Sequence, residues 1–364
     1  MRYINDHMSF NVIHPFNLPL LPPPVTFDSQ EINKLLLKAR TELAELKGYS
    51  LSLPNPNLLL SPAIIRESVA SSNIENINTT VVDVLRNQLF PETEQNKPDK
   101  EVLWYRDAVD WGFANVHKVG ISTRLTLGIQ KKLIPTSYGQ YRTQQNRIEN
   151  SSTKEPLYTP PIASLIPSLI GNLENYLNNE ENIDPLIKTI IGHYQFESIH
   201  PFDDGNGRTG RILMIMQLIN DGLLIFPILY ISGYINKNRS EYYQLLRKIT
   251  TTGKWEDFVL FMLTGFQSQA EETKSTLLKI KILYFDFKKN LKTNFKKIYS
   301  ADLVDNLFSF PIITPVKLAK ELGSHYTTTS RYLITLAKAG ILEEKRLGKY
   351  HLYINKQLLQ VMKK

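Results

Sequence analysis

The chain has 364 residues, of which 42% are hydrophobic and 21% charged, the balance of a globular protein with two or three domains. It contains no cysteine, which excludes disulfides and any zinc or iron–sulfur site built on thiolates. The start of the chain lacks a basic stretch leading into an apolar one, and the apolar segment 212–230 is interrupted by Asn220-Asp221-Gly222. We therefore expect no signal peptide, no membrane span and a cytoplasmic location.

The net charge of +8 is unevenly distributed along the chain. From Glu271 to the C-terminus there are 18 Lys and Arg against 8 Asp and Glu, whereas the residues before it carry a small negative excess. A basic C-terminal quarter suits a polyanion or an acidic protein as a partner. A lysine-rich surface that simply faces water explains the same excess equally well.

Most of the chain carries helical signals, after an arm that contains Pro22-Pro23-Pro24. Ser61-Pro62 has the form of an N-cap followed by proline at the first helical position. Only residues 139–161 indicate a hairpin, with a first short strand at 140–143. The expected helices span 31–46, 61–76, 78–90, 99–117, 122–134, 163–179, 184–198, 208–221, 239–251 and 255–290.

The last residues change character. Residues 314–323 and 324–339 predict two short helices joined by a turn, and 341–354 predict a β-hairpin with a basic turn. This order is the winged-helix pattern. Residues 324–350 carry groups that could reach phosphates and base edges, so they are a candidate DNA-binding surface. Winged helices also bind proteins or mediate dimerisation, and both interpretations stay open.

The most informative segment joins two predicted helices and combines a histidine, acidic residues, glycines and arginines. It reads His200-Pro201-Phe202-Asp203-Asp204-Gly205-Asn206-Gly207-Arg208-Thr209-Gly210-Arg211. Gly205 and Gly207 allow a tight turn that exposes successive N–H groups, and the next helix directs its positive dipole to the same place. Arg208 and Arg211 are three apart and share a helical face. Such a loop predicts a cradle for phosphate.

Two further side chains of this segment supply reactive groups. Asp204 offers a carboxylate beside the cradle, which suits a Mg²⁺ ion bridging phosphates. His200 titrates near neutral pH and can act as a general base. Cradle, cations, carboxylate and base together indicate the transfer of a nucleotidyl group.

The segment resembles the signature of the Fic family, H-P-F-x-D/E-G-N-G-R-x-x-R, and every fixed position is present. The resemblance covers roughly residues 30–270. Within it, 193–199 resembles the family's lead-in helix, and 139–161 resembles the flap that clamps a target segment by strand addition. The family implies a protein adenylyltransferase that uses ATP and Mg²⁺.

The resemblance implies a role for each candidate residue. His200 would deprotonate a Tyr, Ser or Thr hydroxyl of a target protein, whose oxygen attacks the α-phosphorus of ATP and releases pyrophosphate. Asp204 would hold Mg²⁺, and Asn206 with the loop amides would stabilise charge in the transition state. The residues implied to bind the nucleotide are Gly205, Asn206 and Gly207 at the phosphates, Arg208 and Arg211 at their β/γ end, and Tyr242 and Tyr243 at the nucleoside.

A second group of residues lies upstream and fits the family's inhibitory pattern S/T-x-x-x-E-G/N. It reads Ser71-Ser72-Asn73-Ile74-Glu75-Asn76. Ser71 and Glu75 are four apart, so they share a helical face. The resemblance implies that Glu75 pairs with Arg211, neutralises the γ-phosphate site and makes ATP bind in an unproductive pose. We therefore expect an autoinhibited enzyme.

These signals predict a mainly α fold: a Fic-type helical core with a β-hairpin flap, an N-terminal inhibitory-helix region and a C-terminal winged-helix domain. The expected boundaries are 1–110 for the N-terminal region, 111–270 for the catalytic core, 271–300 for a connecting helix and 301–364 for the winged helix. The resemblance also implies a protein target presented to the flap and a homodimer, and we expect no membrane partner.

Two other functions stay open from the sequence. The chain could be a DNA-binding regulator whose Fic part only senses a nucleotide, although a pure sensor need not keep both His200 and Asp204. Some Fic relatives use other phosphate donors or remove AMP, and the sequence excludes neither. His193 and Glu197 are interpreted as packing residues of the lead-in helix.

Overall fold

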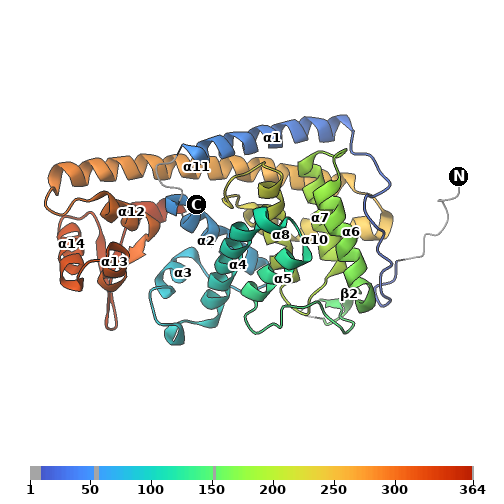
Figure 1. The fold of residues 1–364 in the computed structure, drawn as a ribbon, viewed down its shortest axis with the longest axis horizontal. Coiled ribbons are helices and arrows are strands. Elements are labelled where there is room, and N and C mark those ends of the chain that lie inside the picture. The colour runs from blue at the N-terminus through green and yellow to red at the C-terminus, as the bar shows by residue number, and fades with distance from the viewer. Residues whose placement is uncertain (1–9, 53–56, 151–152, 363–364) are drawn as a thin grey trace.

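The computed structural model describes residues 10–52, 57–150 and 153–362 (Figure 1). Two long helices, α1 (Gln30–Leu51) and α11 (Glu256–Asn294), lie side by side along one edge of the molecule (Figure 1). Ser29 caps α1 by accepting the N–H of Ile32. Past the end of α1, α11 continues and leads the chain to the C-terminal region (Figure 1).

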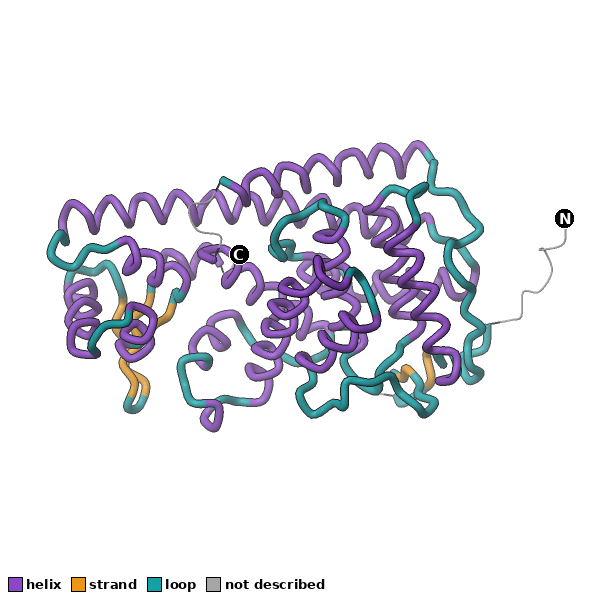
Figure 2. The backbone as a smooth tube through the Cα atoms, in the orientation of Figure 1, coloured by secondary structure: helices purple, strands orange, loops and turns teal. Residues whose placement is uncertain are grey.

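A group of further helices forms the centre of the molecule (Figure 2). They are α2 (Asn57–Ile74), α3 (Val81–Asn87), η1 (Glu92–Glu94), α4 (Lys97–Val119), α5 (Thr123–Leu133), η2 (Ala163–Leu165), α6 (Ile166–Asn179), α7 (Pro185–Ile199), α8 (Asn206–Asn220), α9 (Ile231–Lys237) and α10 (Arg239–Thr252). α8 packs against α7, α4, α5 and α2. Nearly every residue of α7 and α8 is buried, so neither helix has a polar face.

The predicted hairpin is present but shorter than expected. β1 (Ile148–Glu149) pairs antiparallel with β2 (Pro156–Tyr158), and Ile148 lies opposite Tyr158. The strand predicted at 140–143 is wrong, because this segment is a loop. There the N–H of Arg142 donates to the carbonyl of Pro201 at 2.9 Å, so the segment is joined to the motif loop and to no strand.

The C-terminal region combines helices with one small sheet. Its elements are α12 (Ala301–Ser309), β3 (Ile312–Ile313), α13 (Pro315–Leu322), α14 (Tyr326–Lys338), β4 (Glu343–Leu347), β5 (Tyr350–Ile354) and α15 (Lys356–Met362). The antiparallel sheet has the order β3-β5-β4. The helix–turn–helix and the hairpin follow one another as predicted, whereas α12, β3 and α15 were not predicted.

Two central elements also differ from the prediction. α2 begins at Asn57, so Pro62 lies inside the helix and not at its first position. Pro62 has no N–H to donate, so the helix continues through it with one backbone hydrogen bond fewer. α9 was not predicted, because it lies directly after a run of apolar residues with no helical period. Within the described ranges, no helix has the length and apolar character to cross a bilayer.

Candidate active site

The loop between α7 and α8 carries the predicted motif. α7 ends at Ile199, and His200 follows in a left-handed conformation with φ 49° and ψ 60°. Its N–H donates to the carbonyl of Phe196 at 3.1 Å. Few residues with a side chain adopt this conformation, so the surrounding structure must hold it in place. The turn leads the chain directly to the start of α8.

Two glycines form the first turn of α8 and keep it open to an anion. Gly205 is the N-cap with φ 82°, and a Cβ atom there would lie 3.2 Å from the side chain of Ile134. At Gly207 a Cβ atom would lie 2.4 Å from Oε1 of Glu75. The carboxylate therefore reaches the helix start, where unpaired N–H groups and the helix dipole favour negative charge.

Asn206 fixes the shape of the loop. Its Oδ1 accepts the N–H of Phe202 at 2.8 Å, and its Nδ2 donates to the carbonyl of Phe202 at 2.8 Å. Phe202 is buried against Phe196 and Tyr141. The side chain of Asn206 is thus engaged with the backbone, so stabilisation of charge at this position would come from its N–H group.

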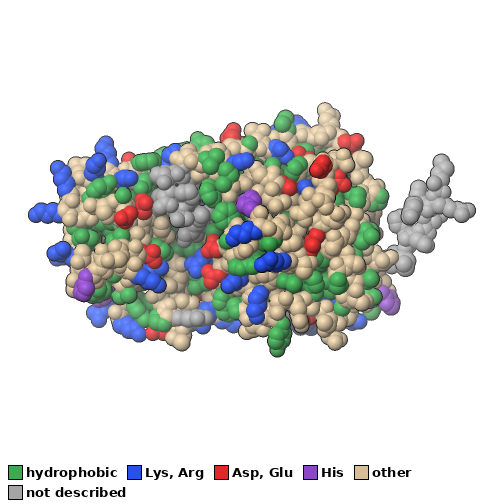
Figure 3. Space-filling view, viewed as in Figure 1, with side chains coloured by type: hydrophobic (Ala, Val, Ile, Leu, Met, Phe, Trp, Pro, Cys, Tyr) green, Lys and Arg blue, Asp and Glu red, His purple; other side chains and the backbone are tan. Residues whose placement is uncertain are grey.

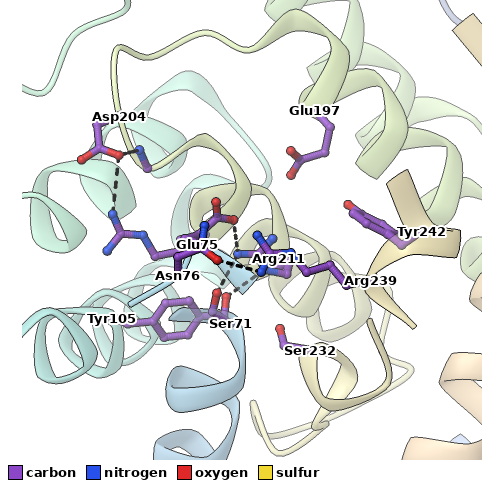
Figure 4. Close-up of polar contacts among 12 residues, drawn as sticks. Ser71, Glu75, Asn76, Tyr105, Glu197, Asp204, Arg211, Ser232, Arg239 and Tyr242 are labelled. Carbon is purple, nitrogen blue, oxygen red and sulfur yellow. Dashed lines mark hydrogen bonds and ion pairs between the residues drawn. The ribbon is translucent and has the colours of Figure 1, made fainter. Parts of the chain in front are cut away.

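Arg211 lies at the centre of the polar contacts drawn in Figure 4. Its Nε donates to Oγ of Ser71 at 2.8 Å, and its Nη2 donates to the carbonyl of Ser71 at 3.0 Å and to Oε1 of Glu75 at 2.7 Å. The side chain of Arg211 is only 1% exposed. The structure therefore brings together the three residues that the inhibitory pattern singled out.

Opposite charges stabilise the contact between Glu75 and Arg211. Burial raises the pKa of Glu75, but the positive charges of Arg211, Arg208 and Arg239 outweigh it and hold the pKa below its usual range. Burial lowers the pKa of Arg211, but Glu75 and Glu197 outweigh it and raise that pKa. Both partners are therefore charged at neutral pH. The side chain of Glu75 is still 34% exposed, so a competing anion can reach it.

Arg208 and Asp204 lie on another side of α8. Nη1 of Arg208 is 3.1 Å from Oε2 of Glu101, and Nη2 is 3.6 Å from Oδ1 of Asp204. The side chain of Arg208 is 3% exposed, whereas that of Asp204 is 71% exposed. Both arginines that were predicted to bind phosphate thus have carboxylates as partners.

The surroundings of Asp204 fit a magnesium ion. Its Oδ1 accepts the N–H of Gly205 at 2.6 Å, and the carboxylate otherwise opens toward solvent. Among the described residues, no three His, Asp or Glu side chains cluster into a metal site of their own. Mg²⁺ commonly takes one or two carboxylates and completes its shell with water and phosphate oxygens. One exposed carboxylate beside a phosphate cradle matches that ligand set.

His200 is neutral at physiological pH in this environment. Burial lowers its pKa to about 4, and the charge of Glu75 and the carbonyl of Glu197 offset only part of that effect. Its Nδ1 is buried and has no hydrogen-bond partner among the described residues. A neutral imidazole keeps one ring nitrogen unprotonated, so the side chain can accept a proton.

Arg142 joins the segment before the flap to the motif loop. Its Nε donates to the carbonyl of His200 at 2.9 Å, its Nη2 to that of Pro161 at 2.6 Å and its Nη1 to that of Gln144 at 3.0 Å. These three bonds satisfy a nearly buried guanidinium and fix the backbone of His200. Nothing in the local sequence around Arg142 indicates carbonyl partners, so this role was not predicted.

Tyr242 and Tyr243 differ in their surroundings. The hydroxyl of Tyr242 shares a hydrogen bond of 2.7 Å with Nε2 of His193, and the ring is 1% exposed. Tyr243 is 44% exposed, and the guanidinium of Arg239 lies 5.9 Å from its ring centroid. Tyr242 is therefore a core residue, and Tyr243 is partly exposed to solvent. Their predicted contact with a nucleoside stays a prediction.

Two buried carboxyl groups lie near Arg211: Glu197, which was interpreted from the sequence as a packing residue, and Glu67, which the sequence did not single out. Glu197 is 15% exposed at its side chain, and burial raises its pKa to about 7. Burial also raises the pKa of Glu67 to about 7. Glu67 accepts hydrogen bonds from the N–H and hydroxyl of Ser232, the first at 3.0 Å, and from the hydroxyl of Tyr105 at 3.4 Å. Glu67 thus ties α2 to α9 and α4, and so helps to position Glu75.

The fold and this loop define a Fic-type protein, and comparisons with known proteins agree. Three family models match the chain: the N-terminal region of the Fic/DOC family over residues 33–114, the Fic/DOC family over 120–218, and the C-terminal domain of SoFic-like protein adenylyltransferases over 283–358. The chain belongs to the Fic/DOC family.

Several curated relatives are named protein adenylyltransferases. A probable protein adenylyltransferase of Aquifex aeolicus is 43% identical over 91 residues, which are 25% of this chain and 26% of that protein. Protein adenylyltransferase Fic of Drosophila grimshawi is 29% identical over 153 residues, which are 40% of this chain and 29% of that protein. The chain thus spans less than a third of the length of these relatives.

Solved structures share the fold. A Fic family protein from Desulfovibrio desulfuricans superposes with a TM-score of 0.60 at 21% identity and covers 92% of this chain and 98% of its own. Fic-1 from Caenorhabditis elegans superposes with a TM-score of 0.51 at 18% identity and covers 66% of this chain and 70% of its own. The first of these likenesses extends over the central helices and the C-terminal region together.

Proposed function

We propose that this protein transfers AMP from ATP to hydroxyl groups of protein side chains, itself included, and that Glu75 restrains this activity. The observation that carries the proposal is the contact between Glu75 and Arg211 at the start of α8. A carboxylate there occupies an anion position beside a complete Fic motif, as a phosphate of ATP would. The relatives that are named protein adenylyltransferases support the same activity.

In this proposal His200 accepts the proton of the target hydroxyl. The hydroxyl oxygen forms a bond to the α-phosphorus of ATP, the bond from that phosphorus to the bridging oxygen breaks, and pyrophosphate leaves. The unprotonated ring nitrogen of the neutral His200 takes the proton. Arg142 is a positioning residue, because its bond to the His200 carbonyl fixes the turn that aims the ring.

The first turn of α8 stabilises the phosphates. The N–H groups after Gly205 and the helix dipole bind negative charge, and Arg208 and Arg211 of α8 add two cations. Asp204 would hold Mg²⁺, which would neutralise part of the negative charge of the phosphates. Arg211 can bind a phosphate only after its ion pair with Glu75 is broken, so the resting protein should transfer AMP slowly.

We propose that the target adds to the flap at β1. The other strand is already covered, because the N–H of Phe16 donates to the carbonyl of Thr159 at 2.9 Å, and Oγ1 of Thr159 donates to the carbonyl of Val12 at 2.6 Å. The rings of Phe10 and Phe16 also pack on Tyr158. Backbone pairing at the remaining edge would present a hydroxyl with little demand on the target's sequence.

One labelling experiment separates the candidate functions. The Glu75→Gly protein is incubated with Mg²⁺ and ATP labelled at the α-phosphate, beside a Glu75→Gly, His200→Ala double variant. We expect label on protein in the first sample and none in the second. Nucleotide binding without label would refute the proposal and favour a nucleotide sensor. Label that enters only from another phosphate donor, or label removed faster than it is added, would favour the other Fic chemistries.

A homodimer and a cytoplasmic location belong to the same proposal. Three apolar side chains of α11, Leu278, Ile282 and Phe285, are between 41% and 55% exposed at spacings that put them on one helical face. A second copy of the chain could cover them. Light scattering of wild-type protein and of Ile282→Glu tests this, and a wild-type monomer at micromolar concentration would contradict it.

We also propose that the C-terminal region binds DNA. Lys and Arg side chains gather at the end of the molecule formed by this region and the end of α11 (Figure 3). On the hairpin Lys345, Arg346 and Lys349 are exposed, and α14 begins with an exposed Tyr326. A fluorescent DNA duplex should bind with an affinity that falls steeply as salt rises, and more weakly to Lys345→Ala, Arg346→Ala. Salt-independent binding would contradict the proposal.

A further inference from the structure

The tip of the C-terminal hairpin touches the segment that follows the inhibitory helix. Nζ of Lys349 is 3.0 Å from Oε1 of Glu94, and the hydroxyl of Tyr350 donates to Oε2 of the same carboxylate at 3.0 Å. The ring of Phe90 lies 4.7 Å, centroid to centroid, from that of Tyr350. We call these four residues the hairpin contact. It joins the C-terminal region to the loop between α3 and α4.

The hairpin contact is exposed and charged, so another anion can compete for it. The side chain of Lys349 is 71% exposed and that of Glu94 is 41% exposed. Hydrogen bonds from Lys349 and Tyr350 hold the pKa of Glu94 below its usual range, so the carboxylate is charged at neutral pH. Glu94 is therefore paired with Lys349, a cation of the hairpin that a DNA phosphate would also bind. A DNA duplex on the hairpin and Glu94 compete for the same group.

The C-terminal region also packs directly on the inhibitory helix. α12 packs against α2 and against α11. Met362 of α15 lines a small cavity together with Pro62 and Arg66 of α2. A displacement of the C-terminal region therefore changes the support of α2 at these contacts as well as at the hairpin.

Hydrogen bonds link the segment that follows Glu94 to the end of α2. Oδ1 of the buried Asp99, at the start of α4, accepts a hydrogen bond from Thr79, and its Oδ2 accepts one from Asn87. The N–H of Thr79 in turn donates to Oδ1 of Asn73 at 3.4 Å. Asn73 lies in the last turn of α2, next to Glu75. The chain from Glu94 back to Glu75 is thus a series of packed and hydrogen-bonded elements.

We infer that DNA binding to the hairpin displaces Glu94, loosens the support of α2 and so raises AMP transfer at Arg211. The inference rests on the proposed function and deepens it by naming what relieves the restraint. By linkage, removal of Glu75 from Arg211 should favour the conformation that binds DNA, so the Glu75→Gly protein should bind DNA more tightly than wild type. Because one exposed contact carries the coupling, we expect a factor of about five, the lower end for coupled sites.

The main test measures self-labelling of the full-length protein from ATP, with and without a mixed-sequence DNA duplex at low salt. DNA should raise the wild-type rate about fivefold. Glu94→Gln and Phe90→Ala should each raise the rate without DNA, one by removing charge and the other by removing packing. Neither should gain much more when DNA is added. Glu181→Gln, on the exposed loop between α6 and α7, removes one carboxylate elsewhere and should behave as wild type.

Hydrogen exchange supplies a readout that does not depend on AMP transfer. DNA should speed the exchange of amides in α2 and α3, and Glu94→Gln should do so without DNA. DNA that binds but changes neither exchange nor labelling would overturn the inference. So would an unchanged rate in Glu94→Gln and Phe90→Ala. If DNA fails to bind while an acidic protein activates, DNA is refuted as the ligand. If hydrogen exchange in α2 and α3 responds to DNA but no variant incorporates labelled AMP, the proposed transferase activity is refuted. The coupling between the hairpin and α2 is then still supported.

Discussion

Two glutamates face cations at similar distances, one in the core and one on the surface. Glu75 lies 2.7 Å from Arg211, and Glu94 lies 3.0 Å from Lys349. The difference is solvent: the side chain of Arg211 is 1% exposed and that of Lys349 is 71% exposed. Charge interactions are strong when water is excluded and weak when it is not. The buried contact can therefore hold the inhibitory helix in place, while the exposed one can be exchanged for another anion.

The largest contrast between the two contacts should be in stability. Arg211→Met leaves Glu75 and Glu197 without their buried cation, so we expect the free energy of unfolding to fall by about 3–5 kcal/mol. Lys349→Met should leave the urea midpoint unchanged, because water already solvates both partners of that pair. Urea unfolding followed by circular dichroism measures both. Equal midpoints for the two variants would remove the distinction between the contacts.

The second contrast is in activity. Glu75→Gly frees Arg211 for a phosphate, so the rate of AMP transfer at low ATP should rise by about tenfold or more, a change of at least ~1.4 kcal/mol. Glu94→Gln acts on the same helix from a distance and should give a smaller rise. Initial rates of label incorporation measure both. Wild-type and Glu75→Gly proteins that label equally fast would show that Glu75 does not restrain the site.

The pH profile tests whether the buried site keeps its base neutral. Since burial lowers the pKa of His200 to about 4, the neutral form that accepts a proton is fully present above pH 5 and is lost as pH falls through 4. The rate of the Glu75→Gly protein should therefore show no acid limb near 6.5, the ordinary value for histidine. A half-maximal rate near pH 6.5 would mean that the ring is solvated during the reaction.

The smallest expected effect is that of salt on the exposed contact. Salt screens the pair of Glu94 and Lys349 much more than the pair of Glu75 and Arg211. Without DNA and at low salt, Glu94→Gln should be faster than wild type, so the ratio of the wild-type rate to the variant rate lies below one. This ratio should rise about twofold, toward one, as salt increases. Dividing by the variant's rate removes the effect of salt on ATP binding. A ratio that does not change with salt would show that the hairpin contact exerts no electrostatic restraint.

The sequence by itself predicted the helical class, the motif from His200 to Arg211, and the group of Ser71 and Glu75. These features depend on local spacing: a turn with two glycines before a helix, and two residues four apart on one face. Local spacing also predicted the helix–turn–helix and the hairpin. It failed at 140–143, where the partner of the backbone is the carbonyl of Pro201 and not a neighbouring strand.

Only the tertiary structure decided which groups meet across the chain. Arg142 reaches the carbonyl of His200, Glu67 ties α2 to Ser232, and Glu94 meets the hairpin, and in each case the partners are far apart in sequence. The burial of these side chains could not be predicted from the sequence either, although burial sets the charge of His200 and the strength of the contact at Arg211. Spacing along a chain determines which side chains share a face, but exclusion of water depends on everything that packs around them.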